Sequence, residues 1–288
     1  MNRPARFWAL GITLAGMALS MSGCAQLEAR DQLNKGVDAY KNAHYEEAID
    51  HFQRATQLDP TLPMAKTYLA TALAQNVAPG LDTPENLKTA NESIRIFEEV
   101  LAKDPSDVNS MKQIAGIYFN IANRNNPQQW EQDLDNAQDW QKKVLAVDPK
   151  DPEAAYTVGV INWTKAHENL LKALQDAGLN DDGKGNVKAP KKVMEPLAKE
   201  NAPLVEESLQ YLNQAVQNRA NYDDAMQYLN LIYRAKADVD YGNAEAVKED
   251  LAEAQDWTSK AMSTRKANEA AKNAGPGGIT MDNSGNLK

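Results

Sequence analysis

The spacing of small, aromatic and proline residues between positions 36 and 60 constrains the fold of this chain most. Small residues stand at three positions, rings at three others, and a proline closes the segment: Gly36, Tyr40, Tyr45, Ala48, Phe52, Ala55 and Pro60. Small residues let two helices cross closely, and rings fill the space that remains between them. Proline cannot continue a helix, because it lacks an amide hydrogen and collides with the preceding turn. The segment is therefore predicted to form two antiparallel helices that end near Pro60.

Parts of this pattern recur along the chain. The closing sequence Leu58-Asp59-Pro60 returns as Lys103-Asp104-Pro105 and Val147-Asp148-Pro149, at spacings of 45 and 44 residues. Seven residues of the segment 133–143 also recur in 250–260 at a constant offset of 117, each segment with a tryptophan at the same place. Such repetition predicts an array in which every helix pair buries its apolar face against its neighbours.

The pattern resembles the 34-residue tetratricopeptide repeat (TPR), most closely at residues 29–62. The resemblance implies an all-α fold, a helix-turn-helix repeat solenoid of four or five repeats with insertions. The repeats are expected at 29–62, 63–107, 108–151, 152–221 and 222–266. Breaker-rich stretches at 77–84 and 123–127 hold residues in excess of the repeat length. An insertion at 178–203 is expected to interrupt the fourth repeat, so that its second helix would cover 206–218.

The N-terminal residues have the pattern of a secretory signal. Arg3 and Arg6 precede an apolar run from Phe7 to Met21. As a helix this run would span roughly 22 Å, which is short of the ~30 Å hydrocarbon core of a bilayer. The pattern predicts a signal peptide rather than a membrane-spanning helix.

The run ends in Met21-Ser22-Gly23-Cys24, which resembles a bacterial lipobox. The resemblance implies removal of residues 1–23 and lipidation of Cys24, which would tie the protein to a membrane. Residues 24–28 would then be a short linker to the first repeat. Because alanine rather than aspartate follows the cysteine, the resemblance implies the outer membrane, facing the periplasm. The alternative is an ordinary signal peptide followed by an incidental cysteine.

Composition and charge exclude several functional classes. Lys and Arg number 31 against 40 Asp and Glu, and the net charge of −9 argues against a nucleic-acid partner. A mean hydropathy of −0.61 excludes a multi-span membrane protein. Residues 267–288 contain a glycine-rich stretch and a polar end, and are expected to be a disordered tail.

No motif in the chain predicts catalysis, a metal or a cofactor. The three histidines do not form a metal-binding motif, and the chain contains neither a glycine-rich phosphate loop nor a nucleophile elbow. The acidic segment 180–186 does not match a calcium loop, because Lys184 and Lys191 fall where oxygen ligands are needed. We therefore do not expect an enzyme.

In the TPR family, first-helix residues line a groove that clamps peptides or partner helices, so the resemblance implies candidate partner-binding positions. The candidates are Tyr40, Lys41, Lys112, Phe119, Asn120, Tyr156, Trp163, Gln227 and Arg234. The same register also places Leu33, Val37, Thr67, Thr71, Gln75 and Val160 in the groove. Each aromatic candidate has the alternative role of packing between repeats, which the cations and amides do not share. A basic residue in the groove suits an acidic peptide or a C-terminal carboxylate.

These patterns favour a non-catalytic scaffold, a lipid-anchored TPR array that recruits or assembles a protein or peptide partner at the bacterial cell envelope. The alternative is a glycan- or small-solute-binding lipoprotein, in which the groove and the insertion at 178–203 form a pocket. Four tryptophans would then stack on sugar rings: Trp130, Trp140, Trp163 and Trp257. The expected placement of Trp140 and Trp257 in second helices favours a packing role for these two.

Overall fold

The computed structural model describes residues 7–273, and it describes side chains from Cys24 onward with the exception of Pro63. These residues form ten helices and no strand, so the predicted all-α fold is confirmed. The side chains of the predicted signal peptide 1–23 and residues 274–288 of the predicted tail lie outside the described part. The chain divides after Ala137 into two units, and each unit is described by itself.

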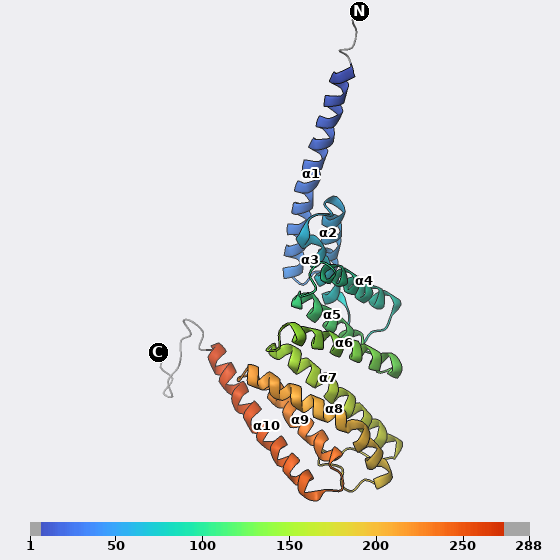
Figure 1. Ribbon diagram of the computed structural model, residues 1–288, viewed down its shortest axis with the longest axis vertical. Coiled ribbons are helices and arrows are strands. Elements are labelled where there is room, and N and C mark those ends of the chain that lie inside the picture. The colour runs from blue at the N-terminus through green and yellow to red at the C-terminus, as the bar shows by residue number, and fades with distance from the viewer. Residues whose placement is uncertain (1–6, 274–288) are drawn as a thin grey trace, which may run out of the picture. The chain divides into compact units, whose positions relative to one another are not determined.

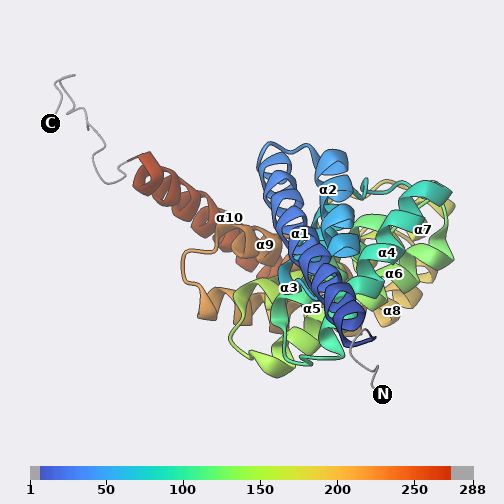
Figure 2. The same ribbon diagram turned by 90° about the horizontal axis from the view of Figure 1, so that it is seen from above.

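Unit 1 is built from helices that pack against one another in chain order. Its helices are α1 (Phe7–Lys41), α2 (Tyr45–Leu58), α3 (Pro63–Asn76), α4 (Pro84–Leu101) and α5 (Val108–Ile121). A further helix, α6 (Pro127–Val147), begins in unit 1 and ends in unit 2. Each helix from α1 to α4 packs against its successor, and α1 and α2 lie side by side in both views of the ribbon (Figures 1 and 2).

Capping residues and proline set where the helices of unit 1 begin. Oγ1 of Thr83 accepts a hydrogen bond from the amide of Asn86 at 3.3 Å, and Pro84 follows it in the first turn, where its missing amide hydrogen removes no helical bond. The carboxylate of Asp107 accepts a hydrogen bond from the amide of Asn109 at 3.2 Å. These caps fix the start of α4 and of α5 by local chemistry alone.

The close crossing predicted for the first helix pair is present at Gly36. A Cβ atom at this position would lie 2.5 Å from Cε1 of Phe52, well inside van der Waals contact. Phe52 is 1% exposed, and Ala48 and Ala55 on the same face of α2 are fully buried. The small residues therefore let α1 approach α2 until the Phe52 ring fills the interface.

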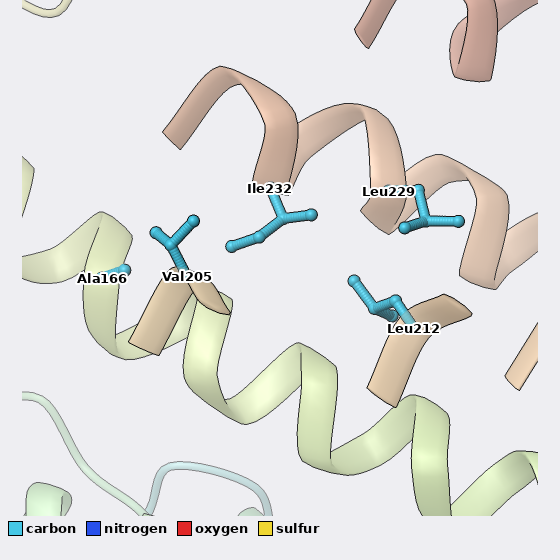
Figure 3. Close-up of a cluster of buried hydrophobic side chains, with 5 residues drawn as sticks. All are labelled: Ala166, Val205, Leu212, Leu229 and Ile232. Atoms are coloured by element: carbon cyan, nitrogen blue, oxygen red, sulfur yellow. The ribbon is translucent and has the colours of Figure 1, made fainter. Parts of the chain in front are cut away.

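Unit 2 repeats the arrangement of consecutive packed helices. Its complete helices are α7 (Pro152–Asp176), α8 (Lys191–Asn218), α9 (Asp223–Val239) and α10 (Ala244–Asn273). α7 packs on α8, α8 on α9, and α9 on α10. Figure 3 shows part of the core where α7, α8 and α9 meet, formed by Ala166, Val205, Leu212, Leu229 and Ile232. None of these five side chains is more than 3% exposed, so buried apolar surface holds the three helices together.

The insertion predicted at 178–203 is shorter than expected. α8 begins at Lys191, so only residues 177–190 connect α7 to α8 outside a helix, and Pro196 and Pro203 lie inside α8. The buried residues of α8 recur every three or four positions from Met194 onward, which gives the helix one continuous face against α7. Burial of this face offsets the backbone hydrogen bonds that the two prolines remove.

Two other segments are also more helical than predicted. Residues 24–28, the predicted linker, lie within α1. α10 continues to Asn273 and so includes the start of the predicted tail, where Nδ2 of Asn268 donates hydrogen bonds of 2.9 Å to the Asn221 carbonyl and the Asp223 carboxylate. Within residues 7–273, no helix has the length and apolar character needed to span a membrane.

Candidate functional site

A groove in unit 1 is the candidate partner-binding site. It has a volume of about 460 Å³ and is lined by α1, α3 and α5, with one residue each from α2 and α4. Val37, Tyr40 and Lys41 come from α1, and Thr67, Tyr68 and Thr71 come from α3. The start of α5 contributes Asp107, Asn109, Ser110 and Gln113. The first helices of three consecutive pairs therefore share one hollow surface.

The floor of the groove is aromatic. Phe52 of α2 and Phe97 of α4 are each 1% exposed and close the bottom of the groove. Tyr68 packs on Phe52 with 5.7 Å between the ring centroids, and Tyr40 packs on Tyr45 at 5.4 Å. Burial, and after it the neighbouring Tyr45, raises the pKa of Tyr40, so its hydroxyl stays neutral at physiological pH. This floor is suited to an apolar side chain.

The rim of the groove carries polar groups without internal partners. Within residues 24–273, the side chains of Asn109 and Gln113 have no hydrogen-bonding partner, and exposed Lys41 has no ion pair. Other rim groups are already used, since Oγ1 of Thr71 donates to the Thr67 carbonyl and Oγ of Ser110 donates to the Asp107 carboxylate. The free amides can bond a peptide backbone, and Lys41 can pair with an acidic group.

The structure brings some of the predicted groove residues of unit 1 together and leaves others apart. Tyr40 and Lys41 line the groove, as do Val37, Thr67 and Thr71, whereas Leu33 and Gln75 do not. Val160, which the same register placed in the groove, is buried in the core of unit 2. The other three candidates of this unit, Lys112, Phe119 and Asn120, lie on α5 and do not line it. Phe119 is 39% exposed, and the Asn120 carbonyl accepts a 2.7 Å hydrogen bond from the Gly80 amide.

Sequence reasoning missed the groove residues at the start of α5. Asn109, Ser110 and Gln113 lie within the first two turns after the cap Asp107. The sequence Asp107-Val108-Asn109-Ser110 is a recognisable helix start, so counting from this cap would have placed the three residues on the groove side.

The predicted site residues of unit 2 belong to other surroundings. Tyr156 of α7 lies 5.0 Å from Tyr222 and 5.5 Å from Tyr228, and Trp163 lies 5.3 Å from Tyr228 between ring centroids. Burial raises the pKa of Tyr222 to about 12. These rings pack α7 against α9, which is the alternative that the sequence left open for aromatic candidates.

Two polar candidates remain in unit 2. Gln227 is half-buried on α9. Arg234 lies on the same helix and lines a small pocket together with Trp163.

The tryptophans proposed to stack on sugars are engaged within the protein. Trp130 is 9% exposed, and Trp163 stacks on His167 with 4.9 Å between centroids. The ammonium groups of Lys143 and Lys260 lie 3.5 Å and 4.3 Å from the ring centroids of Trp140 and Trp257. No observation on these rings favours the glycan hypothesis. Nor do the described residues contain a grouping of three or more His, Cys, Asp or Glu side chains that could hold a metal ion.

Comparison with known proteins supports a repeat fold. Residues 29–62 match the family model of the tetratricopeptide repeat, and none of the curated proteins matches the chain. The structure is similar to residues 41 to the end of MamA from Desulfovibrio magneticus RS-1, with 16% identity, a TM-score of 0.51, and 83% of this chain and 96% of that chain covered. It is also similar to a further crystal structure of MamA, with 11% identity, a TM-score of 0.51, and coverages of 84% and 94%.

At these identities the structural likeness concerns the fold, and the family match concerns residues 29–62. Helix pairs packed in chain order, the small-residue crossing at Gly36 and the first-helix groove agree with both findings. The chain therefore contains a tetratricopeptide repeat at residues 29–62 and has the helical repeat fold of the MamA structures.

Proposed function

We propose that this protein is a non-catalytic scaffold whose unit 1 groove holds an extended peptide segment of a protein partner. The observation that carries the proposal is the pair of unpartnered amides, Asn109 and Gln113, above an aromatic floor. Side-chain amides with free donors and acceptors bond the backbone of an extended chain, whatever its sequence. Apolar contact with this floor would supply most of the binding energy of such a complex.

The groove favours a peptide that carries an apolar side chain next to an acidic group. The apolar side chain would lie on the half-buried rings of Tyr40 and Tyr68, while Phe52 and Phe97, each 1% exposed, support the floor from below. The acidic group would pair with Lys41, whose ammonium has no carboxylate partner among the described residues. An ion pair at such an exposed rim adds selectivity more than affinity.

The same proposal places the scaffold on the outer membrane of the bacterial envelope, on the side that faces the periplasm. Its support is the apolar run before Cys24, the lipobox-like sequence and the exposure of Cys24 on α1. Lipidation at Cys24 would hold the groove near the bilayer, where it would recruit a partner that is itself in the envelope.

A peptide selection tests the groove. Random peptides displayed on phage are selected on the full chain, and the affinity of the selected peptides is measured by fluorescence anisotropy. We expect peptides with an apolar residue beside Asp or Glu. The double variant Asn109→Ala with Gln113→Ala should weaken binding at least tenfold, and Lys41→Glu should weaken it several-fold for the peptides that carry Asp or Glu. None of these three side chains has an internal partner, so the variants should remain folded.

Lys88→Glu is the matched control, because Lys88 is an exposed lysine on α4 outside the groove. Its affinity should stay within about twofold of the wild type, since surface charges far from a site act weakly. Peptides that bind all variants equally would place the binding surface elsewhere, and failure to select any peptide would reject the proposal.

A further inference from the structure

A second, smaller pocket lies in unit 2 between α7, α9 and the loop 177–190. Its volume is about 80 Å³, which is enough for several water molecules or one compact ligand. Trp163 and His167 form an aromatic wall, and Asp181, Arg234 and Asp238 bring charged groups to it. The pocket is separate from the groove of unit 1 and has no role in the function proposed above.

The loop 177–190 is held in place as a wall of this pocket by hydrogen bonds to α9. Nδ2 of Asn186 donates to carboxylate oxygens of Asp181 and of Asp238, each at 2.8 Å. Nη1 of Arg234 donates to the Gly183 carbonyl at 2.9 Å. Gly185 packs so closely that a Cβ atom would lie 3.0 Å from Cγ1 of Val247. The pocket is therefore built from a docked loop and not from a gap between loose segments.

Two opposite charges line the pocket without pairing with each other. The guanidinium of Arg234 bonds neutral acceptors, through Nε to Asn230 and through Nη1 to Gly183, and its Nη2 has no partner in the described part of unit 2. Asp238 is 6% exposed, and one of its oxygens accepts from Asn186. The second oxygen of Asp238 has no donor among the described residues.

Charges removed from water cost free energy unless they are paired, so this arrangement favours a ligand that completes both. A single ion would pair with one of these two charges and be repelled by the other. A group that carries a carboxylate and an ammonium on one carbon would give both charges a partner in a space this small. We propose that the pocket binds a free α-amino acid, with its carboxylate on Nη2 of Arg234, its ammonium on Asp238, and its side chain against Trp163 and His167.

The ionisation of Asp238 makes this binding depend on pH. Burial, and the nearby Asp181 and Asp182, raise the pKa of Asp238 to about 7. Below this pH the carboxyl is protonated and does not offer a negative charge to an ammonium group. The charged groups around Asp238 are those two aspartates on the loop and Arg234 on α9, and the imidazole of His167 on α7 also lines the pocket. Affinity should therefore rise as the pH increases through 7, in step with ionisation of Asp238.

Calorimetric titration of the full chain in detergent tests the proposal with four probes. L-alanine carries both charges, ethylamine only the ammonium, propionate only the carboxylate, and N-methylacetamide neither. We expect L-alanine to bind at least tenfold more tightly than each of the other three at pH 8. A pocket that takes a cation, an anion or a neutral amide would bind the corresponding probe as tightly as L-alanine, and this result or the absence of binding would overturn the proposal.

Variants then assign the charges. Asp238→Asn and Arg234→Gln should each weaken L-alanine binding at least tenfold, and in Asp238→Asn the remaining affinity should no longer change between pH 5.5 and pH 8. Asp256→Asn is the control, because Asp256 is an exposed residue of α10 that pairs with Lys260 outside the pocket. Circular dichroism checks that each variant is folded. Unchanged affinity in folded Asp238→Asn would overturn the assignment, even if peptide binding in unit 1 is intact.

Discussion

At the scale of single residues, the helical glycines of this chain differ in what surrounds them. Gly36 on α1 and Gly159 on α7 each leave room for a side chain of the partner helix, since an added Cβ would lie 2.5 Å from Phe52 and 2.5 Å from Leu212. Gly116 on α5 has no heavy atom within 4 Å of the same position. The repeat pattern predicts Gly36 as a crossing point. Residue type alone does not distinguish Gly116 from the other two, because only the packing shows which face a glycine occupies.

Replacing Gly36 by alanine should destabilise the protein. The added methyl would force the buried Phe52 ring to move, and overpacking of this kind costs about 1–3 kcal/mol. The better helix propensity of alanine returns up to about 1 kcal/mol, so the net change should be a loss. Chemical denaturation followed by circular dichroism measures it. Gly116→Ala is the matched control and should be neutral or stabilising by up to about 1 kcal/mol, and equal effects of the two changes would contradict the packing argument.

At the scale of helices and loops, much of the fold is predictable because start signals are local. The start of α4 follows from Thr83-Pro84, and the start of α5 follows from Asp107. The start of α8 was not predictable in the same way. Pro196 and Pro203 are breaker signals in the sequence, but the continuous buried face of α8 against α7 outweighs them. Tertiary packing of this kind leaves no signal within a short window of sequence.

The candidate site was predictable to a similar degree. Counting from the first repeat placed Tyr40 and Lys41 in the groove, since this repeat has the regular length. The count failed on α5, where Lys112, Phe119 and Asn120 were expected and Asn109 and Gln113 line the groove instead. The loop 77–83 between α3 and α4 adds residues to the repeat, so the register of α5 has to be counted from its own cap.

Asn86 holds that loop in place, and its removal should release the loop. The side-chain oxygen of Asn86 accepts from the Ala78 amide at 2.8 Å, and its nitrogen donates to the carbonyls of Ala78 and Leu81 at 3.0 and 2.6 Å. Asn86→Ala would leave these backbone groups unpaired, at a cost of about 1–3 kcal/mol. Hydrogen exchange of the amides in 77–83 should accelerate accordingly. Lys88→Ala, an exposed change on the same helix, should leave the exchange unchanged, and slow exchange in Asn86→Ala would show that other contacts hold the loop.

At the scale of the whole molecule, the two ends of the described chain differ in a way that matters for the proposed anchor. The last described helix, α10, exposes mainly charged and polar residues from Ala244 to Asn273. At the other end, α1 runs without interruption from the site of the proposed anchor into the first repeat. Ala29 is fully buried only five residues after Cys24, about 7.5 Å along the helix axis. A lipid on Cys24 would therefore be joined to unit 1 by helix and not by a flexible tether.

A flexible linker should separate attachment to the membrane from the stiff helical connection between Cys24 and unit 1. Ten Gly and Ser residues inserted between Ala25 and Gln26 would leave the lipid in place but add a segment of roughly 17 Å root-mean-square length. A photo-crosslinker at exposed Lys35, about 16 Å from Cys24 along α1, should then capture lipid headgroups several-fold less often than in the parent protein. A helical insertion of seven residues at the same point is the control for added length, because it keeps the connection stiff.

Cys24→Ser tests the anchor itself and should move the protein to the soluble fraction. If Cys24→Ser stays with the membrane, the lipid proposal is wrong. A different result is that Cys24→Ser is released while the variant with the flexible insertion crosslinks to lipid headgroups as often as the parent protein. The anchor would then be correct, but the stiff helical connection would not position unit 1.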